Sequence, residues 1–114
     1  MSCYRPQNRL RDKESFQEIF SSKRRLPDKQ FVFIAKKNGY QYARLGLAVP
    51  KRHIQSAVKR NRIKRVLRES LRLRKNQLKG FDLVVLVRRP IKNLKKEYFD
   101  EILDKNWQRI KCEP

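Results

Sequence analysis

Residues 57–72 predict one amphipathic helix whose two sides differ in chemistry. At 100° per residue the apolar side chains fall on one contiguous arc, which also holds Ser70. Lys64, Arg68 and Arg72 form a row at i, i+4 spacing on the opposite side. One side of this helix is therefore suited to a core and the other to an anionic partner. The apolar arc consists of Ile63, Val66, Leu67 and Leu71.

The basic side of this helix is costly without a partner. Residues 59–75 hold nine Lys or Arg and a single acid, Glu69. Like charges at i, i+4 repel, and cations at a helix start oppose the helix dipole. A bound polyanion removes both costs, and arginine offers phosphate a planar fork of donors. A solvated surface helix is the alternative, although such helices usually mix charge signs. The candidate polyanion-binding residues are Arg60, Asn61, Arg62, Lys64, Arg65 and Arg68.

The overall charge points to the same class of partner. The 114 residues carry a formal net charge of +20, with a pI of about 10.8, and their number fits one domain over residues 1–114. Nucleic acid is the leading partner and an anionic membrane surface the second. No apolar run has membrane-spanning length and the start lacks a signal-peptide pattern, so we expect a cytoplasmic protein. Cys3 and Cys112 match no metal-ligand spacing, and we expect neither to have a role.

The segments before the central helix predict a helix followed by strands. Over residues 12–22, Phe16, Ile19 and Phe20 share one helical face. Residues 31–35 are rich in β-formers, and Asn38-Gly39 is typical of a hairpin turn, so we expect the next strand, 42–49, to pair with them. Pro50 ends that strand. A short edge strand around Leu26 and Pro27 is also expected.

The segments after the central helix predict a buried strand and a last helix. Residues 81–87 are almost continuously apolar, which is typical of a strand covered on both faces, and Asp82 within it is expected to be structural. Residues 94–110 carry apolar side chains at helical spacing and four acids, so we expect this helix to pack on the sheet away from the polyanion. The order of elements indicates a compact α+β two-layer sandwich.

No catalytic constellation is visible. The only histidine, His53, lies in a basic loop, and no Ser-His-Asp set, two-metal carboxylate pair or Gly-rich phosphate loop can be assembled. The sequence therefore favours a binding protein over a self-sufficient enzyme. Phe16 and Phe20 have two readings: their rings pack in the core, or they stack on single-stranded bases. Phe31 and Phe33 should share one face of a strand, with Ile34 on the other.

The run Arg60-Asn61-Arg62-Ile63-Lys64-Arg65 resembles the signature of the protein subunit of bacterial ribonuclease P. Asn8-Arg9-Leu10 with Phe16 and Phe20, the stretch Leu45-Gly46-Leu47-Ala48-Val49, and the strand that closes in Arg88-Arg89-Pro90 are also similar to that family. The resemblance covers about residues 8–107.

This resemblance implies a fold and an activity. The family fold is an α-β-β-β-α-β-α sandwich in which the central helix makes a left-handed β-α-β crossover, against the usual right-handed rule. The catalytic centre of the family enzyme is an RNA that, with Mg²⁺, removes the 5′ leader of precursor tRNA by hydrolysis. The protein would then be a subunit of this endoribonuclease, a monomer in a 1:1 complex with the RNA, with no catalytic or metal-binding residue of its own.

The resemblance also implies two binding surfaces. The basic side of the central helix would dock on the catalytic RNA, and a cleft between the sheet and the first helix would hold the precursor-tRNA leader. Ile34 departs from the family, which often has an aromatic residue there, and an aliphatic side chain cannot stack in the same way. The leader-binding residues so implied are Phe16, Phe20, Phe33, Ile34, Lys51, Arg52, Arg88 and Arg89.

Three alternatives stay open on the sequence. A ribosomal or RNA-chaperone protein of related fold would bind RNA without promoting leader-dependent cleavage. A DNA-binding regulator would place the central helix in a major groove, but Pro50 and a strand precede that helix where a helix-turn-helix has another helix. A nuclease active without RNA is disfavoured by the missing carboxylate and histidine constellation.

Overall fold

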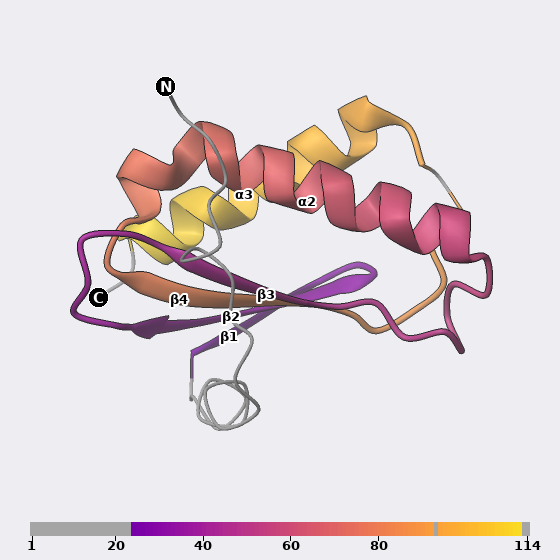
Figure 1. Ribbon diagram of the computed structural model, residues 1–114, viewed down its shortest axis with the longest axis horizontal. Helices are drawn as coiled ribbons and strands as arrows, with labels where there is room; N and C mark the ends of the chain where they lie inside the picture. The colour runs from indigo at the N-terminus through magenta and orange to yellow at the C-terminus, as the bar shows by residue number, and fades with distance from the viewer. Residues whose placement is uncertain (1–23, 93, 113–114) are drawn as a thin grey trace.

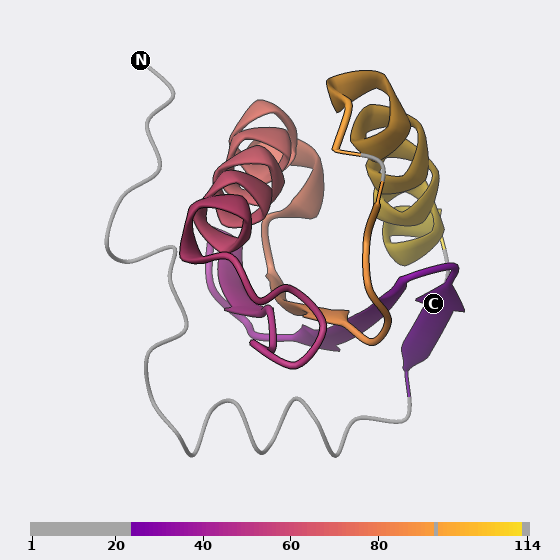
Figure 2. The same ribbon diagram turned by 90° about the vertical axis from the view of Figure 1, so that its right-hand side faces the viewer.

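The chain forms two layers, a four-stranded sheet with two helices packed on one of its faces (Figures 1 and 2). The computed structural model describes residues 24–92 and 94–112. The predicted α+β sandwich is confirmed for these residues, whereas the predicted helix over 12–22 lies outside them. The elements are β1 (Arg25–Asp28), β2 (Phe31–Lys37), β3 (Arg44–Ala48), α2 (Ala57–Leu78), β4 (Phe81–Val87) and α3 (Lys96–Cys112).

The strand order is β1-β2-β4-β3, which contradicts the predicted hairpin between the second and third strands. β4 lies between them, antiparallel to β2 and parallel to β3. Gly39 has a positive φ of 74°, but Asn38 does not, so the pair lacks the two positive φ angles of a type I′ turn. β4 is apolar on both faces, as is typical of a strand inside a sheet, and it takes the place between β2 and β3 while their connecting segment crosses its start. The tight hairpin joins β1 to β2, with Asp28 opposite Phe31.

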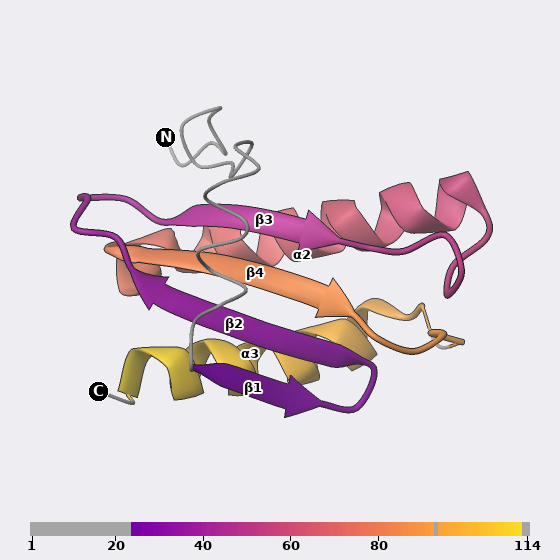
Figure 3. The same ribbon diagram turned by 90° about the horizontal axis from the view of Figure 1, so that it is seen from below.

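The connection from β3 through α2 to β4 is left-handed. In Figure 3 the sheet lies in front of the helices, β3 and β4 run in the same direction, and α2 returns behind them. This is the crossover that the family resemblance implies. α2 begins after Ser56, whose Oγ accepts a hydrogen bond from the Lys59 backbone N–H at 3.3 Å. It ends six residues beyond the predicted boundary, just before Gly80 with its φ of 88°.

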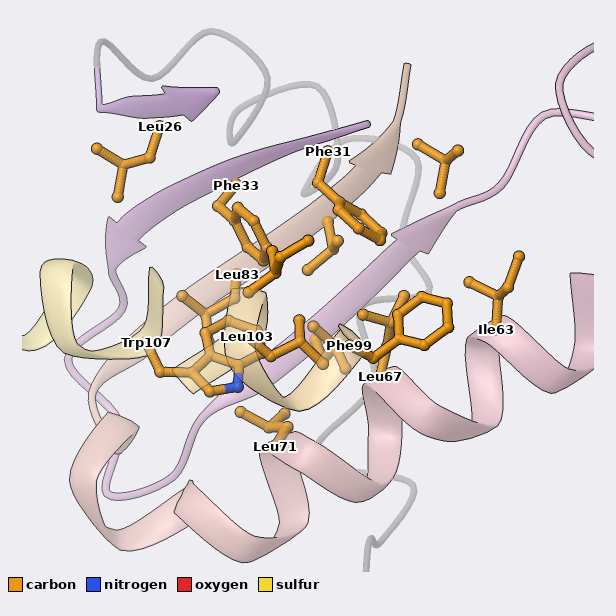
Figure 4. Packing of buried hydrophobic residues seen from close by; sticks show 14 of the residues in the cluster. Leu26, Phe31, Phe33, Ile63, Leu67, Leu71, Leu83, Phe99, Leu103 and Trp107 are labelled. Carbon is orange, nitrogen blue, oxygen red and sulfur yellow. The ribbon is translucent and has the colours of Figure 1, made fainter. Parts of the chain in front are cut away.

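The main core fills the space between the sheet and the two helices (Figure 4). Phe33 of β2 meets Trp107 of α3 edge to face, with ring centres 5.6 Å apart. The predicted apolar arc of α2 is confirmed, since its side chains are buried or partly buried against this core. The core residues labelled in Figure 4 are Leu26, Phe31, Phe33, Ile63, Leu67, Leu71, Leu83, Phe99, Leu103 and Trp107.

A second, smaller cluster lies on the opposite face of the sheet. Val32, Ile34 and Val84 form it, with Leu86 partly buried beside them. Alternate residues of β2 and β4 therefore point into different clusters, as side chains of a strand must. The predicted division of Phe31 and Phe33 from Ile34 is confirmed, and so is the burial of the last strand on both faces.

Candidate RNA interface

The side of α2 that faces away from the core presents a row of basic groups. Asn61, Arg62 and Arg65 are exposed, and Lys64 and Arg68 are half-buried. None of these four cations makes an ion pair with any residue in 24–92 or 94–112. The first turn of the helix also contains no acid. Cations therefore gather here without the acidic partners that a solvated helix usually carries.

Arg72, at the end of the same row, differs from the others. Its guanidinium pairs with Glu69 one turn earlier, and the hydrogen bond from Arg72 lowers the pKa of that carboxyl. The unpaired part of the basic row is therefore the first half of α2, where the predicted polyanion-binding residues lie.

Arg60 has a structural role that the sequence did not reveal. Its Nη1 donates to the backbone carbonyl oxygens of Ile54 and Gln55, each at 2.9 Å. These carbonyls belong to the loop that leads into α2, so the guanidinium fixes the loop against the first turn of the helix. Of the six residues predicted on this surface, Arg60 is the one that the fold itself uses.

Four predicted leader contacts lie at one edge of the sheet. β3 and β4 run parallel, with Ala48 opposite Leu86, so the segments that follow both strands leave the sheet together. Lys51, Arg52 and Arg89 are exposed there, and Arg88 is half-buried. The fold therefore brings together Lys51, Arg52, Arg88 and Arg89.

This basic edge is held by hydrogen bonds to backbone carbonyls. The amides of His53 and Ile54 both donate to the Pro50 carbonyl at 3.1 Å, which closes a turn around Lys51 and Arg52. Arg88 donates its Nε to the Lys29 carbonyl at 2.9 Å and its backbone N–H to the Gln30 carbonyl at 2.9 Å. The Arg88 side chain is thus directed at the β1–β2 turn, while Arg89 is the more accessible of the two.

The prediction that Phe33 lines the leader cleft is wrong. Phe33 has no exposed surface and packs under α3 against Trp107, so its ring cannot meet a nucleic acid base. Ile34 lies on the other face of the sheet in the smaller cluster and is also fully buried. The sheet itself therefore separates two residues that were predicted to share one cleft. Phe16 and Phe20 lie outside the described residues.

A groove of about 330 Å³ runs between α2 and α3 on the side away from the sheet. Arg65 and Leu73 of α2 line it together with Lys96, Asp100 and Asp104 of α3. Arg74 forms an ion pair with Asp104 across it. Side chains of both charge signs line this groove, so it is less suited to a polyanion than the unpaired first half of α2.

Sequence reasoning missed an aromatic pair between β2 and β3. Tyr40 and Tyr42 stack with ring centres 5.1 Å apart and planes within 6° of parallel. The Arg44 guanidinium lies 5.0 Å from the centre of the Tyr40 ring. The signal was the Tyr-Gln-Tyr spacing, since residues two apart in an extended segment share one side.

The described residues contain neither a metal-ligand group nor a membrane-spanning helix. No three His, Cys, Asp or Glu side chains of residues 24–92 and 94–112 are grouped as metal ligands. Within the same ranges no helix is long and apolar enough to span a bilayer.

Comparison with known proteins places the chain in one family. The ribonuclease P family model matches residues 4–111. The ribonuclease P protein component of Vibrio cholerae is 41% identical over 102 residues, which cover 90% of this chain and 86% of that protein. The RNase P protein of Staphylococcus aureus matches the fold with a TM-score of 0.81 at 28% identity, covering 90% of this chain and 94% of that one. The RNase P protein of Thermotoga maritima does so with a TM-score of 0.69 at 32% identity, covering 93% and 97%.

Membership of this family accounts for two features of the structure, the left-handed crossover in the two-layer sandwich and the basic face of α2 without ion-pair partners among the described residues. The family model matches nearly the whole chain, and relatives are 38% and 41% identical over 102 residues. The chain therefore belongs to the ribonuclease P protein family, and is a subunit of the endoribonuclease of tRNA 5′ processing, where it partners the ribonuclease P RNA.

Proposed function

We propose that this chain docks on the catalytic RNA through the first half of α2 and holds the 5′ leader of precursor tRNA at its basic sheet edge. The observation that carries the docking surface is the set of cations on α2 that have no acidic partner among the described residues. The docking residues are Arg60, Asn61, Arg62, Lys64, Arg65 and Arg68.

The energetics favour a polyanion on this surface. In the free protein these cations repel one another and oppose the helix dipole. Each cation that neutralises a phosphate releases condensed counterions, so RNA binding gains free energy that falls steeply with salt concentration. Arg62 and Arg65, both exposed, supply guanidinium forks for this contact, while Arg60 keeps the loop before α2 in place.

The leader surface is proposed at the edge where the loops after β3 and β4 meet. Lys51, Arg52 and Arg89 expose their charges there and contact backbone phosphates, and Arg88 lies beside them at the β1–β2 turn. Phe16 and Phe20 supply base stacking, which contributes about 1–3 kcal/mol per base and tolerates any sequence. A surface that binds phosphate charge and base faces needs no sequence code, which suits one enzyme acting on many precursors.

Mg²⁺ is proposed to be bound mainly by the RNA. The described residues offer no group of three carboxylate, histidine or cysteine ligands for it. In this proposal the chain contributes to the hydrolytic step by neutralising phosphates and positioning the precursor, and the catalytic centre lies in the RNA.

The docking surface is tested with a double variant and a charge-matched control. Arg62→Ala with Arg65→Ala removes two unpaired cations from α2, and Lys92→Ala with Lys111→Ala removes two exposed cations elsewhere. The first pair should weaken binding to the catalytic RNA and lower the slope of log K against log salt by roughly one unit per lost phosphate contact. The control pair should change the RNA affinity and the salt slope much less. Equal effects of the two pairs would indicate a general effect of charge and contradict a specific docking surface on α2.

The leader surface is tested by cleavage. Precursor tRNAs with progressively shorter leaders are cleaved at low Mg²⁺ by a bacterial ribonuclease P RNA, with and without this protein. Stimulation that fades as the leader shortens supports the leader surface, and Phe16→Ala should weaken binding of precursors more than of mature tRNA. Stimulation independent of leader length would support the docking surface on α2 and contradict the leader surface. Tight RNA binding without stimulation favours the RNA-chaperone alternative.

A further inference from the structure

The stacked pair Tyr40–Tyr42 lies at the end of the sheet opposite to the basic edge. In Figure 3 the β2–β3 connection emerges at one end of the strands, and the connections that leave β3 and β4 emerge at the other. β4 has seven residues, so the two ends are about 20 Å apart. The tyrosine pair is therefore separate from the proposed leader edge and from the start of α2.

Tyr40 is an exposed aromatic residue on a highly charged chain. The residue is 47% exposed, and it is one of three large hydrophobic residues exposed within residues 24–92 and 94–112. Tyr42 is half-buried and stacks against it, and the Arg44 guanidinium lies over the Tyr40 ring. An aromatic pair with an adjacent guanidinium offers stacking and cation–π contacts together.

The segment that carries this pair is rigidly held. Asn38 donates its side-chain amide to the Tyr42 carbonyl at 3.2 Å, and its Oδ1 accepts from the Tyr40 backbone N–H at 2.8 Å. The Gly80 amide donates to the same Tyr42 carbonyl at 3.2 Å, which ties the segment to the start of β4. The rings are thus positioned before any ligand arrives, and binding a base there orders little of the chain.

The charge around the pair fits a phosphate chain. Lys37 and Lys79 are exposed, and their chain neighbours Asn38 and Gly80 are hydrogen-bonded to each other beside this segment. Asp82, which accepts a hydrogen bond from Asn38 of this segment, is buried and already paired with Arg44. Exposed aromatic rings flanked by cations are how proteins hold single-stranded nucleic acid without sequence preference.

From this combination we infer that Tyr40 and Tyr42, with Arg44, form a second RNA contact that stacks an unpaired nucleobase. The inference rests on the proposed binding of RNA but not on the α2 face or on the leader edge. The base can come from a distal part of the precursor leader or from a single-stranded region of the catalytic RNA, because both present the same chemistry.

The first test compares oligonucleotides with and without bases. Binding of a fluorescent single-stranded oligoribonucleotide is measured against an abasic strand of the same length, for the full chain and for Tyr40→Ala. The variant should bind the base-bearing strand at least about fivefold more weakly and the abasic strand as the parent does. Tyr40→Phe should retain binding, and Leu73→Ala, which removes another exposed large apolar side chain, on α2, should have no effect.

Two results would overturn the inference. One is unchanged affinity of Tyr40→Ala for the base-bearing strand. The other is an equal loss for the abasic strand, which would indicate lost charge contacts or a damaged fold. Neither outcome depends on whether the chain stimulates precursor cleavage, so failure here is distinct from failure of the proposed function.

The source of the base is identified by photocrosslinking in the assembled enzyme. A photoreactive uridine is placed either through the precursor leader or through the single-stranded regions of the catalytic RNA, and the crosslinked peptide is identified by mass spectrometry. A crosslink to the 38–42 segment from either RNA supports the contact and names its source. Absence of that crosslink from both RNAs counts against the contact.

Discussion

Arg44 on β3 and Asp82 on β4 form a two-point ion pair between neighbouring parallel strands. The Arg44 Nε donates to Asp82 Oδ1 at 2.7 Å, and its Nη2 donates to Oδ2. Asn38 donates to the same Oδ1 at 2.9 Å, which joins the β2–β3 connection to β4. Asp82 is buried, and the hydrogen bond to it raises the pKa of the Arg44 guanidinium. The Asp82 carboxylate therefore accepts three hydrogen bonds and links β4 both to β3 and to the segment that carries Tyr40 and Tyr42.

Asp82→Asn should lower the free energy of unfolding by about 1–3 kcal/mol, because it removes the charge that Arg44 faces and replaces an acceptor with a donor. Urea unfolding at pH 7 measures this. The matched control is Glu69→Gln, which removes an ion pair on the exposed side of α2 and should cost less than about 1 kcal/mol. Equal losses in the two variants would contradict the distinction between them.

Ser70→Ala should destabilise the contact between the two helices. The Trp107 Nε1–H donates to Ser70 Oγ at 2.7 Å, and both residues are buried. Removing the hydroxyl leaves a buried donor without its acceptor, at a cost of about 1–3 kcal/mol. Unfolding of Ser70→Ala, Trp107→Phe and the double variant completes a thermodynamic cycle. The double variant should lose less than the sum of the single variants, whereas strict additivity would argue against the hydrogen bond.

Much of the fold was predictable because its signals are local. The apolar arc that includes Ile63 and Leu67 gave the buried face of α2, and the apolar run 81–87 gave the central strand. Strand pairing was not predictable in the same way. The Asn38-Gly39 dipeptide favours a hairpin between β2 and β3. In the sheet β4 lies between these two strands, and this long-range pairing overrides the local preference.

The candidate site was also predictable only where its signal is local. The basic side of α2 follows from helical periodicity, so its exposed positions were predicted from spacing alone. Phe33 was misplaced because alternation along a strand says which residues share a face but not which face the helices cover. The hydrogen bonds of Arg60 to the Ile54 and Gln55 carbonyls depend on the path of the loop before α2, which no periodicity describes.

Asp28 should make stability depend on pH in the acid range. Burial raises the pKa of Asp28, but the hydrogen bond from Asn106 and the charges of Lys105 and Lys29 outweigh it, so the pKa lies below the ordinary value. The unfolded chain then takes up the proton more readily than the folded chain. The stabilisation is therefore complete above the unfolded pKa of about 3.9 and is lost as the pH falls through the lowered folded value.

The measurement is urea unfolding of the parent and of Asp28→Asn between pH 6 and pH 3. The difference in unfolding free energy should be constant in the upper part of this range and shrink below about pH 4. Because the two proteins share every other titrating group, subtraction removes the general effect of acid on this highly basic chain. A difference that stays constant down to pH 3 would rule out the lowered pKa.

Arg60→Ala should loosen the loop before α2, unlike substitution of its exposed neighbour Arg62. The Arg60 guanidinium is the donor that holds the Ile54 and Gln55 carbonyls, and its loss removes hydrogen bonds worth about 1 kcal/mol. Hydrogen exchange of the His53 and Ile54 amides, both bonded to the Pro50 carbonyl, should then be about fivefold faster. Arg62→Ala should leave these amides unchanged while weakening RNA binding. Faster exchange in both variants, or in neither, would show that Arg60 does not fix this loop.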